Sequence, residues 1–321
     1  MSNGYWLGVD LGGTKILSGL FDDNLKLLAR SKNPTSADGG PSAVFARISQ
    51  GVDAVLREAN VEASQVRGMG IGVPGQIDLG TTRVKFAPNL EWRDVDIKPL
   101  MPPTWSWPVL VENDVRMGTY GEYAYGAAKG ARNVFGVFVG TGVGGGLILN
   151  GELYTGFNGN AGEIGHIIVH WRRGLELESI AGRAHMMKRA KEILDDAPKR
   201  VRKEWKNVEL KNVRSSQLAE FYLKDDPVAV QLVDDAARAL GAGLGSVVNF
   251  LSPEVIVIGG GVTGALGDTF IERIWEIARR YTLPGAADGV KCVPAALGDD
   301  AGIIGCAAYA KARTPAIAVV A

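Results

Sequence analysis

The feature that most constrains the fold is a strand, glycine turn, strand unit that occurs twice in the chain. Short apolar strands are predicted at 5–11 and 16–21 around one turn, and at 134–139 and 146–149 around another. A length of 321 residues also corresponds to about two domains. The repeat therefore predicts two half-molecules of similar build.

The rest of the chain alternates between helical and extended patterns, which is typical of a mixed α/β protein. Apolar residues recur with helical spacing through 41–60, and Asp226 followed by Pro227 predicts the start of a long helix that ends near Phe250. The charged stretch 192–216 loses periodicity and is interpreted as a solvated helix or excursion. Further strands are predicted at 25–31, 66–73, 109–112 and 255–258, and further helices at 114–125 and from about 300, the last packing back on the N-terminal domain.

Composition excludes several classes of function. The 35 basic and 35 acidic side chains balance, so the chain lacks the basic excess that nucleic-acid binding requires. Two cysteines, Cys292 and Cys306, are too few for a disulfide framework and favour a reducing cytoplasm. The apolar stretch 5–9 ends at Asp10 with no basic region before it, and no apolar run reaches the roughly 20 residues of a membrane span. We expect a cytoplasmic protein with no membrane or nucleic-acid partner.

The first glycine turn has the composition of a phosphate-binding loop. In Asp10-Leu-Gly-Gly-Thr-Lys15, the two glycines lack Cβ atoms and let backbone N–H groups approach an anion. Thr14 adds a hydroxyl, Lys15 adds a cation, and the carboxylate of Asp10 suits Mg²⁺ held through water. A glycine-stabilised hairpin without ligand is the alternative. The predicted nucleotide-binding residues of this turn are Asp10, Gly12, Gly13, Thr14 and Lys15.

The second turn, 140–146, contains five glycines in seven residues. So many glycines would cost much chain entropy if the turn only reversed the chain, so a second phosphate loop facing the first is the better explanation. A third segment, 259–261, follows a buried strand and either supports a nucleotide base or ribose or makes a close strand-to-helix turn. The nucleotide-binding residues predicted in these two segments are Gly140, Thr141, Gly142, Gly144, Gly260 and Gly261.

Taken together, seven segments resemble the ROK family of sugar kinases and sugar-responsive repressors. They run in order over nearly the whole chain, at 10–15, 72–75, 87–90, 112–114, 140–146, 162–166 and 253–261. The resemblance implies the two-domain α/β fold of actin, Hsp70 and hexokinase, which is ribonuclease H-like, with an interdomain cleft. The implied domains are 1–114 plus 302–321 (smaller, N-terminal) and 115–301 (larger, C-terminal). It also implies ATP with Mg²⁺, a hexose acceptor and a homodimer.

The same resemblance assigns the sugar site. Asp114 is the catalytic base that takes the proton of the acceptor hydroxyl, and the other sugar-binding residues are Gly75, Asn89, Asn113, Glu163, His166 and Glu178. Glu176 competes with Glu178, because the loop before them differs in length from the family pattern. Carboxylates and amides suit a polyol, since they bind vicinal hydroxyls, and phosphoryl transfer needs mainly alignment and charge screening. Helix capping is the alternative role for Asp114.

The chain departs from the family at the zinc site. Most ROK kinases combine a histidine with three cysteines, but the stretch from His166 to Glu178 contains no cysteine. Structural zinc needs four N or S ligands, and His166 and His170 cannot supply them. We therefore predict no structural zinc. The hypothesis is that packing of Trp171 and bonds within the loop orient His166 and Glu178 instead.

There are three alternatives to a glucose kinase, which differ in the sugar, in catalytic activity or in the class of protein. Fructose, mannose, allose or N-acetylmannosamine could be the acceptor instead of glucose. A non-catalytic, sugar-sensing repressor would need a DNA-binding segment, and only nine residues precede Asp10. An actin-like or chaperone ATPase would have no use for Glu112-Asn-Asp114 or for Gly162-Glu-Ile-Gly-His166. The preferred prediction is an ATP-dependent kinase that converts glucose to glucose 6-phosphate.

Overall fold

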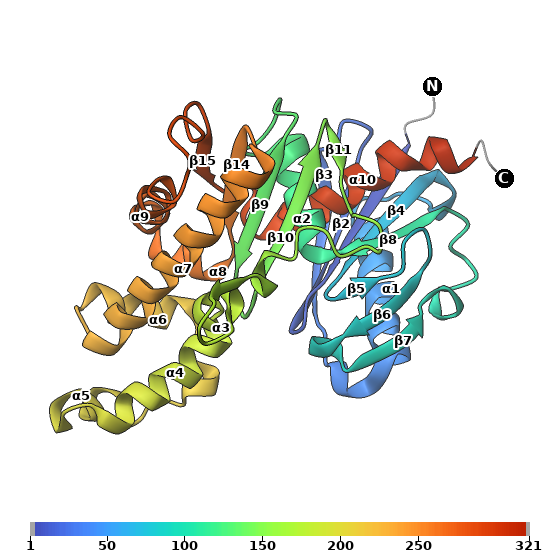
Figure 1. Cartoon of the computed structure of the whole chain (residues 1–321). Helices are drawn as coiled ribbons and strands as arrows, with labels where there is room; N and C mark the ends of the chain where they lie inside the picture. Colours follow the sequence, from blue (N-terminus) through green and yellow to red (C-terminus); the bar gives the residue numbers. More distant parts are fainter. Residues whose placement is uncertain (1–3, 319–321) are drawn as a thin grey trace.

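The computed structural model describes residues 4–318 and contains two five-stranded sheets of the same build (Figure 1). The strand orders are β3-β2-β1-β4-β8 and β11-β10-β9-β14-β15. In each sheet two antiparallel strands come first, and the two strands on the other side run parallel to the central one. The predicted repeat of two similar halves is confirmed at the level of the sheets.

The strands have the following bounds. The first sheet comprises β1 (Tyr5–Leu11), β2 (Lys15–Phe21), β3 (Leu27–Pro34), β4 (Val66–Val73) and β8 (Val109–Asn113). The second comprises β9 (Val134–Val139), β10 (Val143–Leu149), β11 (Glu152–Leu153), β14 (Val255–Gly259) and β15 (Lys291–Pro294). Two small sheets complete the set: β5 (Gln76–Ile77), β6 (Arg83–Ala87) and β7 (Trp92–Asp96), and the hairpin of β12 (Ile168–His170) and β13 (Leu175–Glu176). Sequence patterns predicted none of the strands of these two small sheets.

The helices follow the apolar spacing of the sequence. The α-helices are α1 (Gly40–Glu58), α2 (Asp114–Tyr125), α3 (Leu177–Ala181), α4 (Arg183–Asp196), α5 (Lys199–Trp205), α6 (Ser215–Leu223), α7 (Pro227–Leu251), α8 (Gly261–Leu266), α9 (Asp268–Arg279) and α10 (Ala301–Ala318). Helix α7 begins where the sequence predicted, because the carboxylate of Asp226 accepts hydrogen bonds from the N–H groups of Val228 and Ala229 at 3.0 and 2.9 Å. None of the helices in the described chain is both long enough and apolar enough to cross a membrane.

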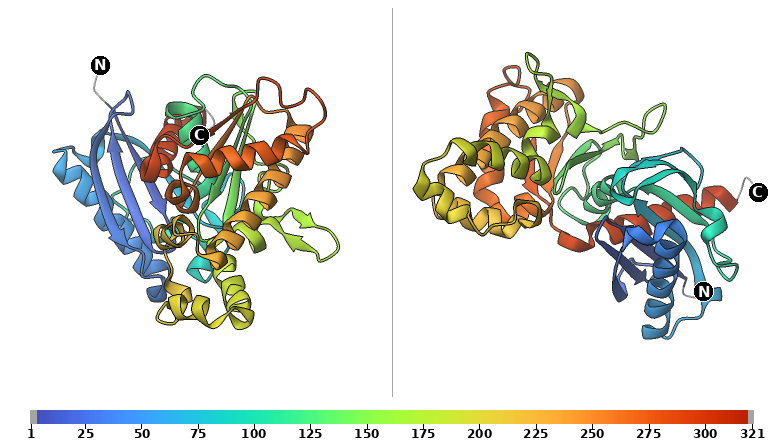
Figure 2. Two further views of the ribbon diagram at one scale, coloured as in Figure 1. Left: turned by 90° about the vertical axis from the view of Figure 1, so that its left-hand side faces the viewer. Right: turned by 90° about the horizontal axis from the view of Figure 1, so that it is seen from below.

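Helices α2 and α10 lie between the two sheets and contact each other (Figures 1 and 2). Helix α10 packs on β1 and β4, as predicted for the last helix, and α2 packs on β9 and β10. Their backbones approach so closely that a Cβ atom at Gly305 would overlap the carbonyl oxygen of Met117. The packing of these two helices therefore fixes the position of the first residue of α2, Asp114, relative to both sheets.

The charged stretch 192–216 is largely helical and its charged side chains are exposed, which agrees with its interpretation as a solvated helix or excursion. It includes the end of α4 and all of α5, which project from the body of the larger half (Figure 1). Trp205 is buried, stacks on Phe221 with ring centroids 4.3 Å apart, and donates a hydrogen bond to Asp226 at 3.1 Å. Sequence analysis did not predict this anchoring, in which a buried tryptophan holds a segment whose charges all face outward.

Gly305→Ala tests the contact between α2 and α10. Alanine favours a helix, but here its methyl group would force the two backbones apart, so we expect the free energy of unfolding to fall by about 3 kcal/mol. The measurement is denaturant unfolding followed by circular dichroism. Gly264→Ala in α8 is the control, because a Cβ there meets no atom within 4 Å. Equal stability of the two variants would contradict the proposed packing constraint.

Candidate active site

Two carboxylates, Asp10 and Asp114, lie at the carboxyl ends of β1 and β8, two parallel strands that β4 separates. Asp10 lies near the end of β1 and pairs in register with Gly72 of β4. Strand β8 leads directly into α2, whose first residue is Asp114, and a Cβ at Gly72 would lie 3.2 Å from the Cα of Asp114. Ligands bind at this edge of open α/β sheets, so the topology places both acids where a substrate can reach them.

Both carboxylates have raised pKa values. Burial and, to a smaller extent, the charge of Asp114 raise the pKa of Asp10 to about 7 against the opposing effect of Lys15. Burial also raises the pKa of Asp114 to about 6, although the N–H of Val115 donates a hydrogen bond to it at 2.9 Å. A carboxyl group with a pKa near 6 suits general base catalysis near neutral pH. This pair therefore combines a candidate base with a negative site for a cation.

The first glycine turn presents two free amides beside Asp10. The N–H of Gly12 donates to the carbonyl of Lys15 at 2.9 Å and so closes the turn instead of facing a ligand. Within the described chain, the amides of Gly13 and Thr14 make no hydrogen bond. The ammonium of Lys15 lies 2.6 Å from the carboxylate of Asp299. Gly13 and Thr14 are thus the predicted residues of this turn whose amides remain available to a phosphate.

The second glycine turn is held by helix α4 and by Glu178. The carbonyl groups of Gly140 and Thr141 accept hydrogen bonds from the first two N–H groups of α4, each at 3.0 Å. The carboxylate of Glu178 accepts from the N–H of Val143 at 2.7 Å. A Cβ at Gly144 would lie 2.7 Å from the side chain of Val115, so this turn borders the start of α2 and Asp114.

The third glycine segment is a close strand-to-helix turn beside the second. Gly260 has a φ of +98°, and a Cβ there would overlap the carbonyl oxygen of Val139, which precedes the second turn. Of the two interpretations offered by the sequence, the tight turn accounts for the glycine by itself. The packing also brings Gly260 and Gly261 to the same end of the second sheet as the turn at 140–146.

The predicted sugar residues of the first half surround the first glycine turn. Asn89 lies against Gly13, since a Cβ at Gly13 would be 3.4 Å from the Cβ of Asn89. Asn113 is 8% exposed; its side-chain oxygen caps α2 by accepting from the N–H of Arg116 at 3.1 Å, and its Nδ2 donates to the carbonyl of Gly75 at 3.2 Å. Asn113 therefore links α2, the helix that begins with Asp114, to the turn at Gly75.

Arg116 connects the two halves of the site, and sequence analysis missed it. Its guanidinium is almost fully buried and lies 2.9 Å from the carboxylate of Glu112 and 3.8 Å from that of Glu163. It also donates to the carbonyl of Gly159. The pKa of Glu163 is raised by burial, and the charge of Arg116 opposes this rise. Helical spacing gave no signal for this pair, because Glu112 lies on β8 and only Arg116 lies on α2.

The region of the missing cysteines forms the β12–β13 hairpin. The Nδ1 of His166 lies 3.1 Å from the carboxylate of Glu176, which raises the pKa of His166. The N–H of Leu177 donates to the carbonyl of Ile167 at 3.0 Å. Trp171 is 79% exposed and stacks only with Arg172, so the predicted packing role of Trp171 is wrong. Hydrogen bonds of the loop, not tryptophan burial, hold His166 beside Glu176.

The metal question can be judged only from donor groups. Among residues 4–318, no group of three or more histidine, cysteine or acidic side chains could hold a metal ion. The prediction that the chain has no structural zinc stays a prediction.

Glu176 and Glu178, the two competing candidates for the sugar contact, make different contacts. Glu176 pairs with His166, while Glu178 accepts a hydrogen bond from the second glycine turn.

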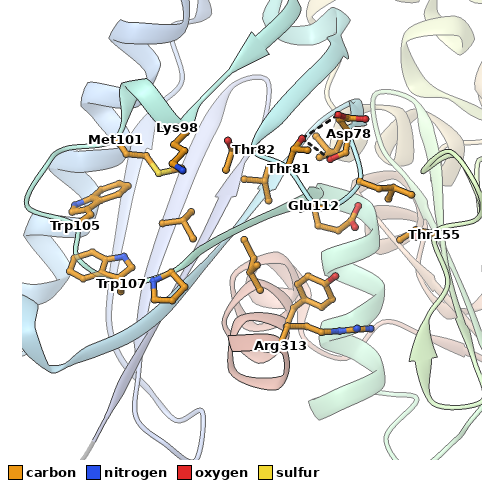
Figure 3. A pocket seen from close by; sticks show the side chains of 18 of the residues that line it. Asp78, Thr81, Thr82, Lys98, Met101, Trp105, Trp107, Glu112, Thr155 and Arg313 are labelled. Atoms are coloured by element: carbon orange, nitrogen blue, oxygen red, sulfur yellow. Dashed lines mark hydrogen bonds between the residues drawn. The ribbon is translucent and has the colours of Figure 1, made fainter. Parts of the chain in front are cut away.

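A large cavity lies away from this site. It has a volume of about 1090 Å³ and lies along the outer edge of β8, between the β5–β6–β7 sheet and α10 (Figure 3). Trp105, Trp107, Glu112 and Arg313 are among the side chains that line it. Neither Asp10 nor Asp114 does. We therefore place the active site by its converging carboxylates and glycine turns, not by cavity size.

Duplicated sheets with buried carboxylates at the strand ends and a glycine turn in each half define the two-domain α/β fold of actin, Hsp70 and hexokinase. The chain belongs to the ROK family, whose model matches residues 6–313. It is 34% identical to a glucokinase of Halalkalibacterium halodurans, over 95% of this chain and 94% of that protein. It is 32% identical to a glucokinase of Streptomyces coelicolor, over 97% and 99%.

Solved structures agree with this assignment. A ROK family glucokinase from Streptomyces griseus, determined with glucose and AMPPNP, superposes with a TM-score of 0.80 at 30% identity and covers 96% of this chain and 100% of its own. A ROK hexokinase from Thermus thermophilus gives a TM-score of 0.80 at 31% identity, over 97% and 99%. The family resemblance stated from the sequence motifs is confirmed.

Arg116→Met tests the buried ion pair. The change leaves Glu112 buried without its cation, so the free energy of unfolding is expected to fall by about 3–5 kcal/mol. The second change Glu112→Gln, added to Arg116→Met, should recover part of this loss, because the unpaired charge is removed. Arg83→Met, which breaks an exposed pair with Asp94, is the control and should change stability little. A wild-type unfolding midpoint for Arg116→Met would refute the role of the pair.

Proposed function

We propose that this protein is an ATP-dependent hexose kinase that phosphorylates glucose to glucose 6-phosphate. The observation that carries the proposal is the buried carboxylate of Asp114, placed between two glycine turns whose free amides suit a polyphosphate. The similarity to glucokinases over nearly the whole chain supports ATP and glucose as the two substrates. Fructose, mannose, allose and N-acetylmannosamine are the alternative acceptors, and a panel of these sugars assayed by ADP release separates them.

In the proposed reaction, Asp114 takes the proton of the sugar's 6-hydroxyl as the oxygen attacks the γ-phosphorus of ATP. A new O–P bond forms, the bond between the γ-phosphorus and the bridging oxygen breaks, and ADP leaves with that oxygen. Asn89, Asn113 and Glu163 hold the sugar, and the amides of the glycine turns bind the phosphates. Little covalent chemistry is required from the protein, so alignment of the two substrates supplies most of the rate enhancement.

Asp10 fits the Mg²⁺ that accompanies ATP. Mg²⁺ binds one or two carboxylates together with phosphate oxygens and water. Gly302 lies directly against Asp10, since a Cβ there would lie 2.7 Å from its carboxyl carbon, so glycine keeps this side of the carboxylate free of a side chain from that position. The raised pKa of Asp10 marks a site where negative charge lacks enough compensation. When bound, Mg²⁺ would neutralise charge on the phosphates, and Asp10 would hold it.

Several further properties belong to this proposal. The domains are 1–114 with 302–321 and 115–301, and closure of the cleft between them excludes water as a competing acceptor. Hinges near 113–116 and 299–304 would permit the closure.

The proposed assembly is a homodimer. Both cysteines are free thiols, which supports a cytoplasmic location.

Asp114→Asn tests the base. Glucose binding, measured by calorimetry, should stay near that of the wild type, while kcat should fall by several powers of ten because both proton acceptance and alignment are lost. The neutral amide also relieves the cost of a buried charge, so the thermal midpoint should not fall. Asp94→Asn is the control, because Asp94 is exposed and lies in β7, outside the predicted site. Normal turnover by Asp114→Asn would exclude this residue as the base.

The pH dependence of kcat/KM follows from the two raised pKa values. Asp114 must be ionised to accept a proton, and its pKa of about 6 lies above that of an ordinary aspartate. Activity should therefore decline as the pH falls from 7 toward 5, with both Asp10 and Asp114 becoming protonated in the free enzyme. Initial rates at low glucose measure this, with melting curves to show that the fold persists. A rate constant that stays level down to pH 5 would contradict the assignment.

A further inference from the structure

A cavity lined by three arginines lies beside the β12–β13 hairpin, and no step of the proposed reaction uses it. It has a volume of about 350 Å³ and lies between the β12–β13 hairpin and helices α4 and α7. The hairpin projects from the body of the protein beside α7 (Figure 2). The cavity is separate from Asp10, Asp114 and the glycine turns, none of which lines it.

The charges around this cavity do not balance. Arg173 from the hairpin, Arg189 from α4 and Arg238 from α7 line it, while Asp235 is the one acidic residue in its lining. Asp235 is already engaged, because its carboxylate lies 2.5 Å from Nη2 of Arg189. In the described part of the chain, neither Arg173 nor Arg238 forms an ion pair. A chain with zero net charge thus concentrates two unpaired guanidinium groups in one hollow.

One nitrogen of Arg189 lacks a hydrogen-bond partner. The Nη1 atom of Arg189 is inaccessible to solvent and has no hydrogen-bond partner. A buried guanidinium nitrogen without a partner is costly, since it has lost water and gained nothing in return. An anion in the cavity would offset the repulsion among the three arginines that line it.

We propose that this cavity binds the phosphate group of a small molecule. A guanidinium group matches a phosphate in charge and geometry, because its paired N–H donors meet two oxygens at once. Arginines from three separate elements can surround a tetrahedral dianion, and His170 adds a further ring nitrogen to the lining. A concave surface also focuses the positive potential toward its centre.

The floor of the cavity indicates where the phosphate comes from. Val169, Leu175 and Ile180 give it an apolar side, and the ring of Tyr281 borders it. Free phosphate would leave these groups uncovered, whereas a phosphate monoester with an apolar or aromatic part would cover them. A monoester is therefore expected to bind more tightly than inorganic phosphate.

Occupancy should act on the sugar site through the hairpin, an effect that rests on the proposed function. The hairpin that carries Arg173 also carries Glu176, which holds His166, and Ile180 lies on α3 with Glu178. A ligand that ties the hairpin to α7 would restrict the motion of these residues. At saturating ATP, the KM for glucose should therefore fall when the cavity is occupied, because a loop already ordered loses less entropy on sugar binding.

The test is calorimetric titration of the intact protein with inorganic phosphate and, separately, with phenyl phosphate. Saturating AMPPNP and glucose are present so that the glycine turns are blocked. The wild type should bind one equivalent of each, with phenyl phosphate the tighter. Arg173→Gln combined with Arg238→Gln should weaken both by about tenfold or more, since two charge-assisted contacts are lost.

The matched control is Arg172→Gln combined with Arg279→Gln. These two exposed arginines lie on the same hairpin turn and at the end of α9, and neither lines the cavity. The control should bind like the wild type. Absence of binding beyond the blocked glycine turns, or equal weakening by both double variants, would overturn the site. A KM for glucose that phenyl phosphate does not change would overturn the coupling, while normal kinase activity throughout keeps this outcome distinct from failure of the proposed function.

Discussion

The active site depends on the backbone contact between α2 and α10 at the centre of the molecule. Helix α10 lies on β1 and β4, α2 lies on β9 and β10, and the two helices touch where Gly305 faces Met117. One sheet thereby positions Asp10, and the helix that contacts the other sheet begins with Asp114. The first sheet, through the ends of β1 and β8, sets the distance between the two carboxylates. The packing of the helices brings the second glycine turn to the same place, where Gly144 faces Val115.

Buried charge is the second constraint, and it is managed differently at each position. Glu112 and Arg116 neutralise each other away from water. Arg116 also joins α2 to the loop that carries Glu163. Asp10 and Asp114 have no such partner, and burial raises their pKa values. Uncompensated charge at a strand end costs stability and is commonly found where a protein binds or transforms a ligand. This contrast separates the paired acid Glu112 from Asp10 and Asp114, the two acids of the proposed catalytic site.

Hydrogen bonds order the β12–β13 hairpin, which lacks the cysteines of the family pattern. Backbone pairing of β12 with β13, the contact of His166 with Glu176, and the bond from Val143 to Glu178 fix the residues that the family holds beside its zinc site. These bonds are individually weak and partly exposed, so the hairpin is softer than a metal-bound loop. A ligand in the proposed arginine-lined site would restrict the motion of such a hairpin.

The sequence by itself determined the repeat of strand, glycine turn and strand, the helix starts at Asp114 and Asp226, and the family, because these depend on short-range patterns and local backbone chemistry. It could not show that Trp205 anchors a charged segment, that Trp171 stays exposed, or that the small sheet at 76–96 exists. Only the tertiary structure decided which partner each buried charge finds: Arg116 reaches Glu163, and Glu178 reaches Val143, across 47 and 35 residues of chain. Contacts of that separation leave no periodic trace in a single sequence, since they depend on how the two sheets pack around α2 and α10.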